Sequence, residues 1–206
     1  MARTYGIVLF EGFELLDVFG PAEAFGMLKH FDPANQLLMI SHDGGPAASA
    51  QGPRVLADHS FASCPPLDLL LLPGGMGTRQ GVHDEAQKAF VRERAASTAL
   101  MTSVCTGSAV FAAAGLLDGR RATSNKRSWK WVIEHGPAVN WVPEARWVVD
   151  GDIMTSAGVS AGIDMALAAI ERLEGASVAG TVAAAMEDDW HRDPAWDPFA
   201  KLNAIV

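Results

Sequence analysis

Two residues of this chain have the types and surroundings that nucleophilic and acid–base chemistry needs. The first is Cys105, which follows an apolar run, residues 99–104, and precedes small residues typical of a helix. A thiol at such a strand-to-helix turn lies at the carboxyl edge of a sheet, facing the free N–H groups and positive dipole end of the helix. This position predicts a lowered thiol pKa and a nucleophilic cysteine. The alternative is that Cys105 is a small buried hydrophobe, as free cysteines often are.

The second residue is Asp17, an acid placed among the apolar side chains of residues 13–25. A carboxyl removed from water has a raised pKa and could hold or shuttle a proton beside a thiolate. The other interpretation makes Asp17 the N-cap of the helix that contains Gly20 and Pro21, a role that stabilises a helix by about 1 kcal/mol.

Several small residues surround these two candidates. Gly107 permits close backbone approach, and the N–H groups of Thr106 and Gly107 are expected to face a developing anion. Gly74 and Gly75 follow the apolar run 67–72, without the residues of a phosphate-binding loop or a dinucleotide fingerprint. We interpret them as backbone N–H groups that line a pocket, with a purely conformational turn as the alternative.

The elements that position these residues alternate between strand and helix patterns. Apolar runs predict strands, amphipathic stretches predict helices, and turn residues at 44–53 and 150–152 predict two hairpins. This alternation predicts a mostly parallel sheet with helices on both faces, which binds ligands at the carboxyl ends of its strands. The expected strands are 5–10, 36–41, 54–60, 67–72, 99–104, 121–124, 144–149 and 153–156, and the expected helices are 15–28, 84–97, 128–135, 160–173 and 176–190.

Composition limits the remaining possibilities. The 206 residues can form one well-buried core, so a single domain over residues 1–206 is expected. A net charge of −8 argues against nucleic acid as a partner, and no apolar run reaches the length of about 18 residues that a membrane span needs. Cys64, Cys105 and the six histidines show no metal-ligand spacing, so neither a metal nor another cofactor is expected. The absence of a signal-peptide pattern favours a cytoplasmic location.

Five segments together resemble the ThiJ/PfpI superfamily. They stand in the family's order over nearly the entire chain, at residues 15–22, 70–77, 102–108, 116–123 and 156–164. The resemblance implies a flavodoxin-like three-layer α/β/α sandwich, usually dimeric, with the cysteine on a nucleophile elbow. Asp17, the Cys-Thr-Gly of residues 105–107 and the Ala-Gly-Ile-Asp of residues 161–164 are most similar to isocyanide (isonitrile) hydratases. Those enzymes convert an isocyanide and water to an N-substituted formamide; the same pattern also occurs in ligand-sensing domains of some transcription regulators.

The resemblance implies a role for each candidate. Cys105 attacks the terminal isocyanide carbon, Asp17 supplies a proton, and Thr106 with the Gly75 N–H group holds the polar atoms of the intermediates. The residues expected to line the substrate and oxyanion site are Gly74, Gly75, Gly107, Asn125 and Gly158. A small-molecule substrate and a homodimer follow from the resemblance, without a cofactor, nucleic acid or membrane.

Two positions depart from relatives of this kind. Thr106 stands where protease-like and amidotransferase-like members have a histidine, so no adjacent imidazole can act as a base. Asn125 replaces a histidine that hydratase-like members often carry, which leaves the substrate open. The alternatives are a glyoxalase- or deglycase-type enzyme on 2-oxoaldehydes, and a non-enzymatic redox or ligand sensor in which Cys105 oxidises to a sulfinate.

The aromatic and proline residues of the tail, residues 188–199, leave three possibilities. The tail could cover the pocket mouth, contact a dimer partner or cap the last helix. Trp129 and Trp131 could likewise line the pocket or belong to the core.

Overall fold

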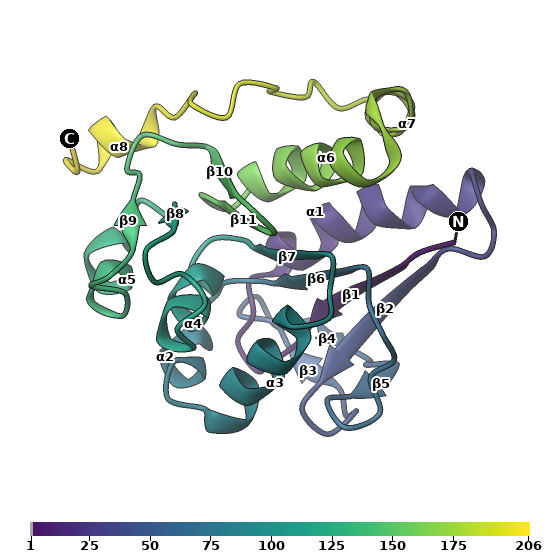
Figure 1. Cartoon of the computed structure of the whole chain (residues 1–206), viewed down its shortest axis with the longest axis horizontal. Coiled ribbons are helices and arrows are strands. Elements are labelled where there is room, and N and C mark those ends of the chain that lie inside the picture. Colours follow the sequence, from purple (N-terminus) through teal and green to yellow (C-terminus); the bar gives the residue numbers. More distant parts are fainter. Residues whose placement is uncertain (1) are drawn as a thin grey trace.

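The computed structural model describes residues 2–206 and has a central seven-stranded sheet between two layers of helices (Figure 1). The strand order is β10-β11-β7-β6-β1-β2-β5, and every neighbouring pair is parallel except β10 with β11. The strands are β1 (Thr4–Val8), β2 (Gln36–Ser41), β5 (His59–Ser60), β6 (Leu69–Leu72), β7 (Leu100–Ser103), β10 (Trp147–Asp150) and β11 (Ile153–Ser156). The predicted flavodoxin-like α/β/α fold is therefore confirmed.

The helices divide between the two faces of the sheet. The layer formed by α1 (Leu15–Gly26), α6 (Ala161–Glu174) and α7 (Ala176–Ala185) covers one face. The other face carries α2 (Thr78–Gly81), α3 (Glu85–Ala95), α4 (Gly107–Ala113) and α5 (Trp129–Glu134). A short 3₁₀ helix, η1 (Met27–His30), extends α1.

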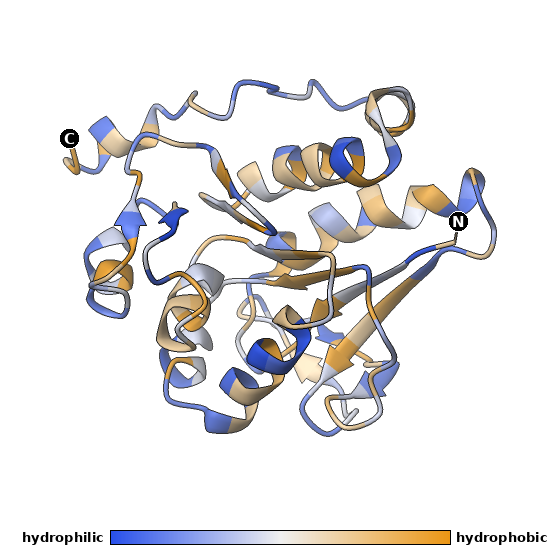
Figure 2. Ribbon diagram, viewed as in Figure 1, coloured by the Kyte–Doolittle hydropathy of each residue, from blue (hydrophilic) through white to orange (hydrophobic). Residues whose placement is uncertain are grey.

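The central strand β6 shows why this sheet is buried on both faces. Its four leucines are fully buried; Leu69 and Leu71 join the core under α1 and α6, whereas Leu70 and Leu72 join the core under α3 and α4. Side chains of a strand alternate between the two faces, so an uninterrupted apolar run fits a strand covered on both sides. Figure 2 shows the apolar residues concentrated in the sheet and the inward helix faces.

Two small sheets accompany the main one. The predicted hairpin after β2 forms from β3 (Ala47–Ala48) and β4 (Arg54–Val55), and β5 then joins the main sheet beside β2. A second pair consists of β8 (Arg121–Ala122) and β9 (Asn140–Trp141). Helix α7 ends at Ala185, five residues before the end predicted for it. No helix among residues 2–206 has the length and apolar character needed to cross a membrane.

After α7, the chain runs along the sheet edge formed by β10 and ends in a short helix, α8 (Phe199–Leu202), near α5 (Figure 1). The segment is tied to this edge by backbone contact, because the Arg146 N–H donates to the Pro194 carbonyl at 2.8 Å. The tail thus reaches the same end of the sheet as the turn that carries Cys105.

Candidate active site

Cys105 occupies the sharp turn between β7 and α4, as predicted. Its φ is 56°, a left-handed conformation that non-glycine residues adopt rarely and that is typical of a strained nucleophile elbow. The turn is held from the neighbouring strand, since the Cys105 N–H donates to the Ala157 carbonyl at 2.9 Å. Cys105 is 6% exposed, so the thiol is largely shielded from solvent.

Three glycines allow other segments to approach this turn closely. A Cβ at Gly107 would lie 2.4 Å from the Leu72 carbonyl oxygen, and a Cβ at Gly74 would lie 2.6 Å from the Thr106 nitrogen. A Cβ at Gly158 would lie 2.8 Å from the Cys105 sulfur. All three distances are shorter than real Cβ contacts, so side chains here would displace the turn or the thiol. The segments that carry Gly74, Cys105 and Gly158 therefore lie together at one edge of the sheet, as predicted.

Asp17 lies in the first turn of α1, and Glu14 is the N-cap of that helix. The N-cap interpretation of Asp17 is therefore wrong. The Asp17 side chain is fully buried, and its Oδ2 accepts a hydrogen bond from the Gly74 N–H at 2.8 Å. Its Oδ1 accepts no hydrogen bond from any residue in the range 2–206. One carboxyl oxygen is thus fixed against the glycine turn, and the carboxyl lies next to the Cys105 side chain.

Burial controls the acidity of this pair of residues. Desolvation raises the pKa of Asp17 to about 8, although the hydrogen bond from the Gly74 N–H lowers it. The charge of Glu14 raises the Asp17 pKa further, and contact with the Cys105 side chain lowers it. Desolvation also raises the pKa of the Cys105 thiol well above its ordinary value, and the neighbouring charge of Asp17 adds to this effect. At neutral pH the pair therefore holds protons close to the nucleophilic sulfur.

The predicted lowering of the thiol pKa is wrong for a physical reason. Hydrogen bonds from the Thr106 N–H and from the Thr106 side chain lower the Cys105 pKa. Removal of the thiol from water and the adjacent carboxyl outweigh these hydrogen bonds.

The expected oxyanion donors are only partly available. The Gly75 N–H donates to Thr106 Oγ1 at 3.1 Å, and the Gly107 N–H donates to the Val104 carbonyl at 2.9 Å. Thr78 Oγ1 also lies 3.0 Å from Thr106 Oγ1. The Thr106 side chain therefore holds the glycine turn at Gly75. Of the expected N–H groups, the Thr106 N–H is the one directed at the thiol.

A cavity of about 670 Å³ opens above Cys105. Asn125 borders it, and its Oδ1 accepts a hydrogen bond from the Ser128 N–H at 3.0 Å. Gly158 borders an adjoining cavity of about 340 Å³, which Asn125 also lines. The residues around the larger cavity are Glu14, Ala50, Gln51, Gly75, Met76, Arg79, Cys105, Thr106, Asn125, Arg127, Ser128 and Val159. The set contains a nucleophile and cations but no histidine.

Comparison with known proteins identifies the family. Residues 4–172 match the model of the DJ-1/PfpI family. The chain belongs to this family.

Relatives of this DJ-1/PfpI protein include enzymes and regulators. It is 36% identical over 188 residues to the isonitrile hydratase of Pseudomonas putida, a match that covers 91% of this chain and 79% of the hydratase. It is 29% identical to the HTH-type transcriptional regulator CdhR of Pseudomonas aeruginosa, over 87% of this chain and 53% of the regulator. Among solved structures, a THiJ/PfpI family protein from Pseudomonas syringae is 31% identical, with a TM-score of 0.83 over 92% of this chain and 76% of that one. Drosophila melanogaster DJ-1beta, at 20% identity, shares the fold with a TM-score of 0.81 over 92% of this chain and all of that one.

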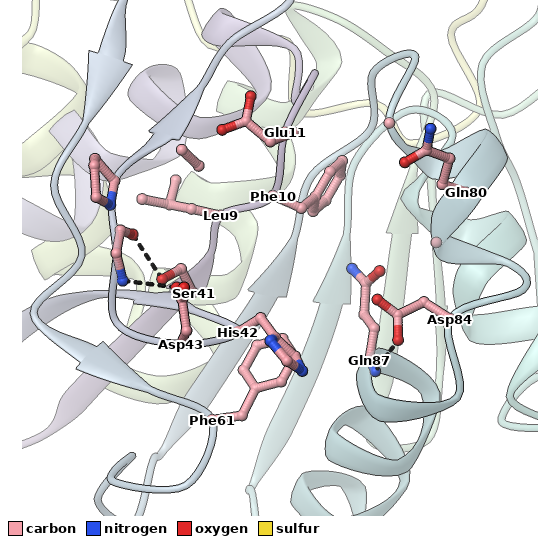
Figure 3. A pocket seen from close by; sticks show the side chains of 15 residues that line it. Leu9, Phe10, Glu11, Ser41, His42, Asp43, Phe61, Gln80, Asp84 and Gln87 are labelled. Carbon is pink, nitrogen blue, oxygen red and sulfur yellow. Dashed lines mark hydrogen bonds between the residues drawn. The ribbon is translucent and has the colours of Figure 1, made fainter.

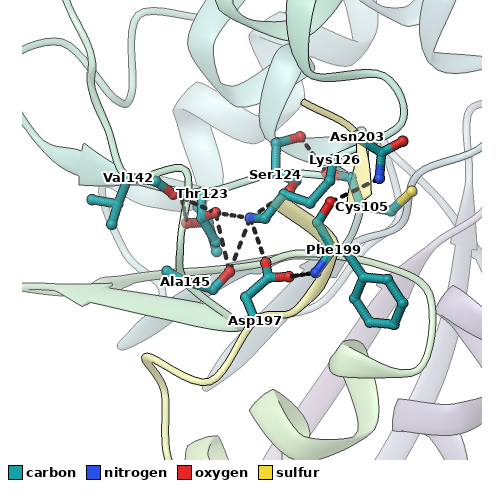
Figure 4. Close-up of polar contacts among 10 residues, drawn as sticks. Cys105, Thr123, Ser124, Lys126, Val142, Ala145, Asp197, Phe199 and Asn203 are labelled. Atoms are coloured by element: carbon teal, nitrogen blue, oxygen red, sulfur yellow. Dashed lines mark hydrogen bonds and ion pairs between the residues drawn. The ribbon is translucent and has the colours of Figure 1, made fainter. Parts of the chain in front are cut away.

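The structure also reveals an ion pair that the sequence patterns did not indicate. Lys126, on the loop after β8, pairs with Asp197 of the tail at 3.0 Å, and their side chains are 2% and 1% exposed (Figure 4). The ammonium also donates to Thr123 Oγ1 and to the carbonyls of Ser124 and Ala145. Ser124 Oγ in turn donates to the Cys105 carbonyl at 2.8 Å. The tail is therefore connected to the nucleophile turn through a buried polar network.

The positions of the tail and the two tryptophans answer the open questions about them in part. Phe199 of the tail and Asn203, which follows it, border the same adjoining cavity as Gly158, so the tail lies next to the site. Trp129 is buried, whereas Trp131 is partly exposed and stacks beneath the guanidinium of Arg79. Arg79 lies four residues after Gly75, and its closeness to the glycine turn in sequence is the one signal that could have indicated it.

A third cavity, of about 350 Å³, lies at the carboxyl ends of β1 and β2 (Figure 3). His42 and Asp43 border it on one side, and Asp84 and Gln87 border it on the other. Neither cysteine of the chain lines it. The candidate chemistry is therefore placed in the cavity above Cys105.

The raised pKa of Asp17 predicts a pH-dependent cost to folding. An acid with a pKa of about 8 in the folded chain and 3.8 when unfolded favours folding fully below about pH 4, and this contribution is lost as the pH rises to 8. We expect Asp17→Asn to stabilise the fold relative to the wild type, by on the order of a few kcal/mol at pH 8 and by little at pH 4. Denaturant unfolding of both proteins across this range tests it. A stability difference that does not grow with pH would contradict the assignment of the raised pKa to Asp17.

Proposed function

We propose that this DJ-1/PfpI protein hydrates isocyanides to N-substituted formamides, with Cys105 as nucleophile and Asp17 as proton carrier. The observation that carries the proposal is a buried carboxyl of raised pKa beside an elbow thiol that lines a cavity. The 36% identity to an isonitrile hydratase over most of both chains supports the same reaction.

In the first step the sulfur of Cys105 attacks the terminal carbon of the isocyanide. A carbon–sulfur bond forms, and that carbon receives one proton, giving a thioimidate in which the substrate nitrogen is doubly bonded to it. The sulfur loses its own proton during attack, so the thiol and isocyanide combine without an oxidant or reductant. Asp17 is suited to move this proton, because a pKa near the working pH lets a group both accept and donate.

In the second step water attacks the thioimidate carbon. The oxygen forms a bond to that carbon, and the substrate nitrogen takes up one of the water protons. Collapse of this intermediate forms the formyl C=O group, breaks the carbon–sulfur bond and returns the second proton to the sulfur. Asn125 and the Thr106 N–H are the polar groups near the thiol that can hold the intermediates.

The direct test measures formamide formation from one aryl and one alkyl isocyanide, with methylglyoxal assayed in parallel. We expect formamide from the wild type, only background from Cys105→Ala, and undiminished turnover from Cys64→Ala, which removes the other buried cysteine. Lactate from methylglyoxal without formamide would replace this proposal with the glyoxalase-type reaction. The absence of turnover on both substrate classes would leave the sensor interpretation instead.

A further inference from the structure

Arg79 presents a fixed guanidinium to the cavity above Cys105. Its Cζ lies 3.6 Å from the ring centroid of Trp131, so the planar group rests on an aromatic face. One terminal nitrogen lies 3.3 Å from Ser128 Oγ, and the other lies 3.3 Å from Thr78 Oγ1. Both contacts are long and to neutral oxygens. These contacts orient the Arg79 side chain, but they do not neutralise its positive charge.

No carboxylate neutralises the cations of this cavity. Within residues 2–206, no carboxylate oxygen lies within 4.0 Å of a nitrogen of Arg79 or Arg127. The one carboxylate that lines the cavity, Glu14, accepts a hydrogen bond from Gln51 Nε2 at 2.6 Å. Two guanidinium groups thus face one carboxylate, although the whole chain carries a net charge of −8. Partial burial lowers the pKa of Arg79, and the charge of an ionised Cys105 opposes this shift.

A guanidinium with a fixed orientation is well suited to bind a carboxylate. Its parallel N–H groups match the two oxygens of that group, and hydrogen bonds between two charged partners are stronger than those between neutral ones. No carboxylate of residues 2–206 binds the Arg79 guanidinium beside the nucleophile. A ligand with a carboxylate would satisfy it, whereas a purely apolar ligand would leave the cation partly desolvated.

We infer that the substrate of the Cys105 site is a small isocyanide that carries a carboxylate away from its reacting carbon, and that Arg79 binds this carboxylate with Arg127 as a second cation. This inference rests on the proposed function and adds the class of substrate to it. Arg79 is thereby a specificity-determining residue.

The kinetic test compares isocyanoacetate with its methyl ester, which has the same reacting group but no charge. We expect the wild type to prefer the acid, and Arg79→Gln to lower kcat/KM for the acid by about ten- to a hundredfold, mainly through KM. The ester should change by less than about threefold. Arg127→Gln should act in the same direction with a smaller effect, because Arg127 is exposed. Arg92→Gln, an exposed arginine on α3 outside the cavity, is the matched control and should leave both substrates unchanged.

A second measurement does not depend on isocyanide turnover. Cys105 displaces iodide from iodoacetate or from neutral iodoacetamide, forming a carbon–sulfur bond, and peptide mass spectrometry separates its product from that of Cys64. Arg79→Gln should lower the iodoacetate rate relative to the iodoacetamide rate by about tenfold, whereas Arg92→Gln should not.

The two experiments separate the inference from the function on which it rests. If the wild type forms no formamide, the proposed function fails, and the alkylation ratio still decides whether Arg79 recruits anions. If Arg79→Gln lowers acid and ester turnover equally, or leaves the alkylation ratio unchanged, the carboxylate inference is overturned even where hydration stands.

Discussion

Replacing Asp17 with Asn is expected to lower isocyanide turnover by about a hundred- to ten-thousandfold, the usual contribution of a positioned acid–base group. Asparagine keeps the size of the side chain and an oxygen that can accept the Gly74 N–H, so the site should retain its shape. It cannot carry the proton that the isocyanide carbon must receive. Cys105 should therefore remain open to alkylation by iodoacetamide while turnover is lost.

The size of this effect follows from the acidity of the thiol. An ordinary cysteine is about 3% thiolate at pH 7, and burial reduces this fraction further at Cys105. The nucleophile is thus not activated by a lowered pKa, and proton transfer must account for more of the rate. Loss of the Asp17 charge should also ease ionisation of Cys105, so alkylation near pH 8 should be at least as fast as in the wild type.

Steady-state formamide assays and timed alkylation of the same preparations test this prediction. Asp189→Asn removes an exposed carboxyl in the tail and serves as the matched control, with no change expected in either assay. Near-normal turnover by Asp17→Asn would show that another group carries the proton. Loss of alkylation together with turnover would show that the substitution had disrupted the elbow itself.

Replacing Asp197 with Ala is expected to destabilise the fold by about 3 kcal/mol or more, because removing one member of a buried ion pair leaves the other charge uncompensated. The Lys126 ammonium donates hydrogen bonds to three neutral oxygens, and the carboxylate of Asp197 balances its positive charge. For a chain of this size the loss corresponds to a fall in Tm of about 6 to 12 °C. The tail should then detach from the loop that carries Asn125.

Denaturant unfolding of a double-mutant cycle tests the assignment. Lys126→Met in the Asp197→Ala background removes the stranded charge and should restore part of the lost stability. Asp193→Ala is the matched control, since this aspartate lies in the same tail and is exposed, and its side chain accepts a local hydrogen bond from the Ala195 N–H. A loss below about 0.5 kcal/mol for Asp197→Ala would place the pair among ordinary surface ion pairs.

The path of the backbone could be predicted from local sequence. The apolar run of β6, the small residues after Cys105 and the hairpin signal after β2 each depend on neighbours in sequence, and the structure agrees with each. The carboxyl-edge rule then placed the glycine turn, Cys105 and Gly158 together, as their close approaches show. The ends of elements were less well determined, as in α7, because an amphipathic pattern continues beyond the residues that find packing partners.

What the sequence determined by itself was therefore the fold, the elbow and the choice of Cys105 and Asp17 as the residues to consider. The tertiary structure decided how they behave. The thiol pKa rises because burial and the Asp17 charge outweigh the hydrogen bonds from Thr106, and both depend on residues that are remote in the chain. Two further contacts, between Arg79 and Trp131 and between Lys126 and Asp197, also join separate segments, so no local sequence pattern predicts them. Periodicity encodes which side chains are buried, whereas charge and solvation at a site are set by what folding brings beside it.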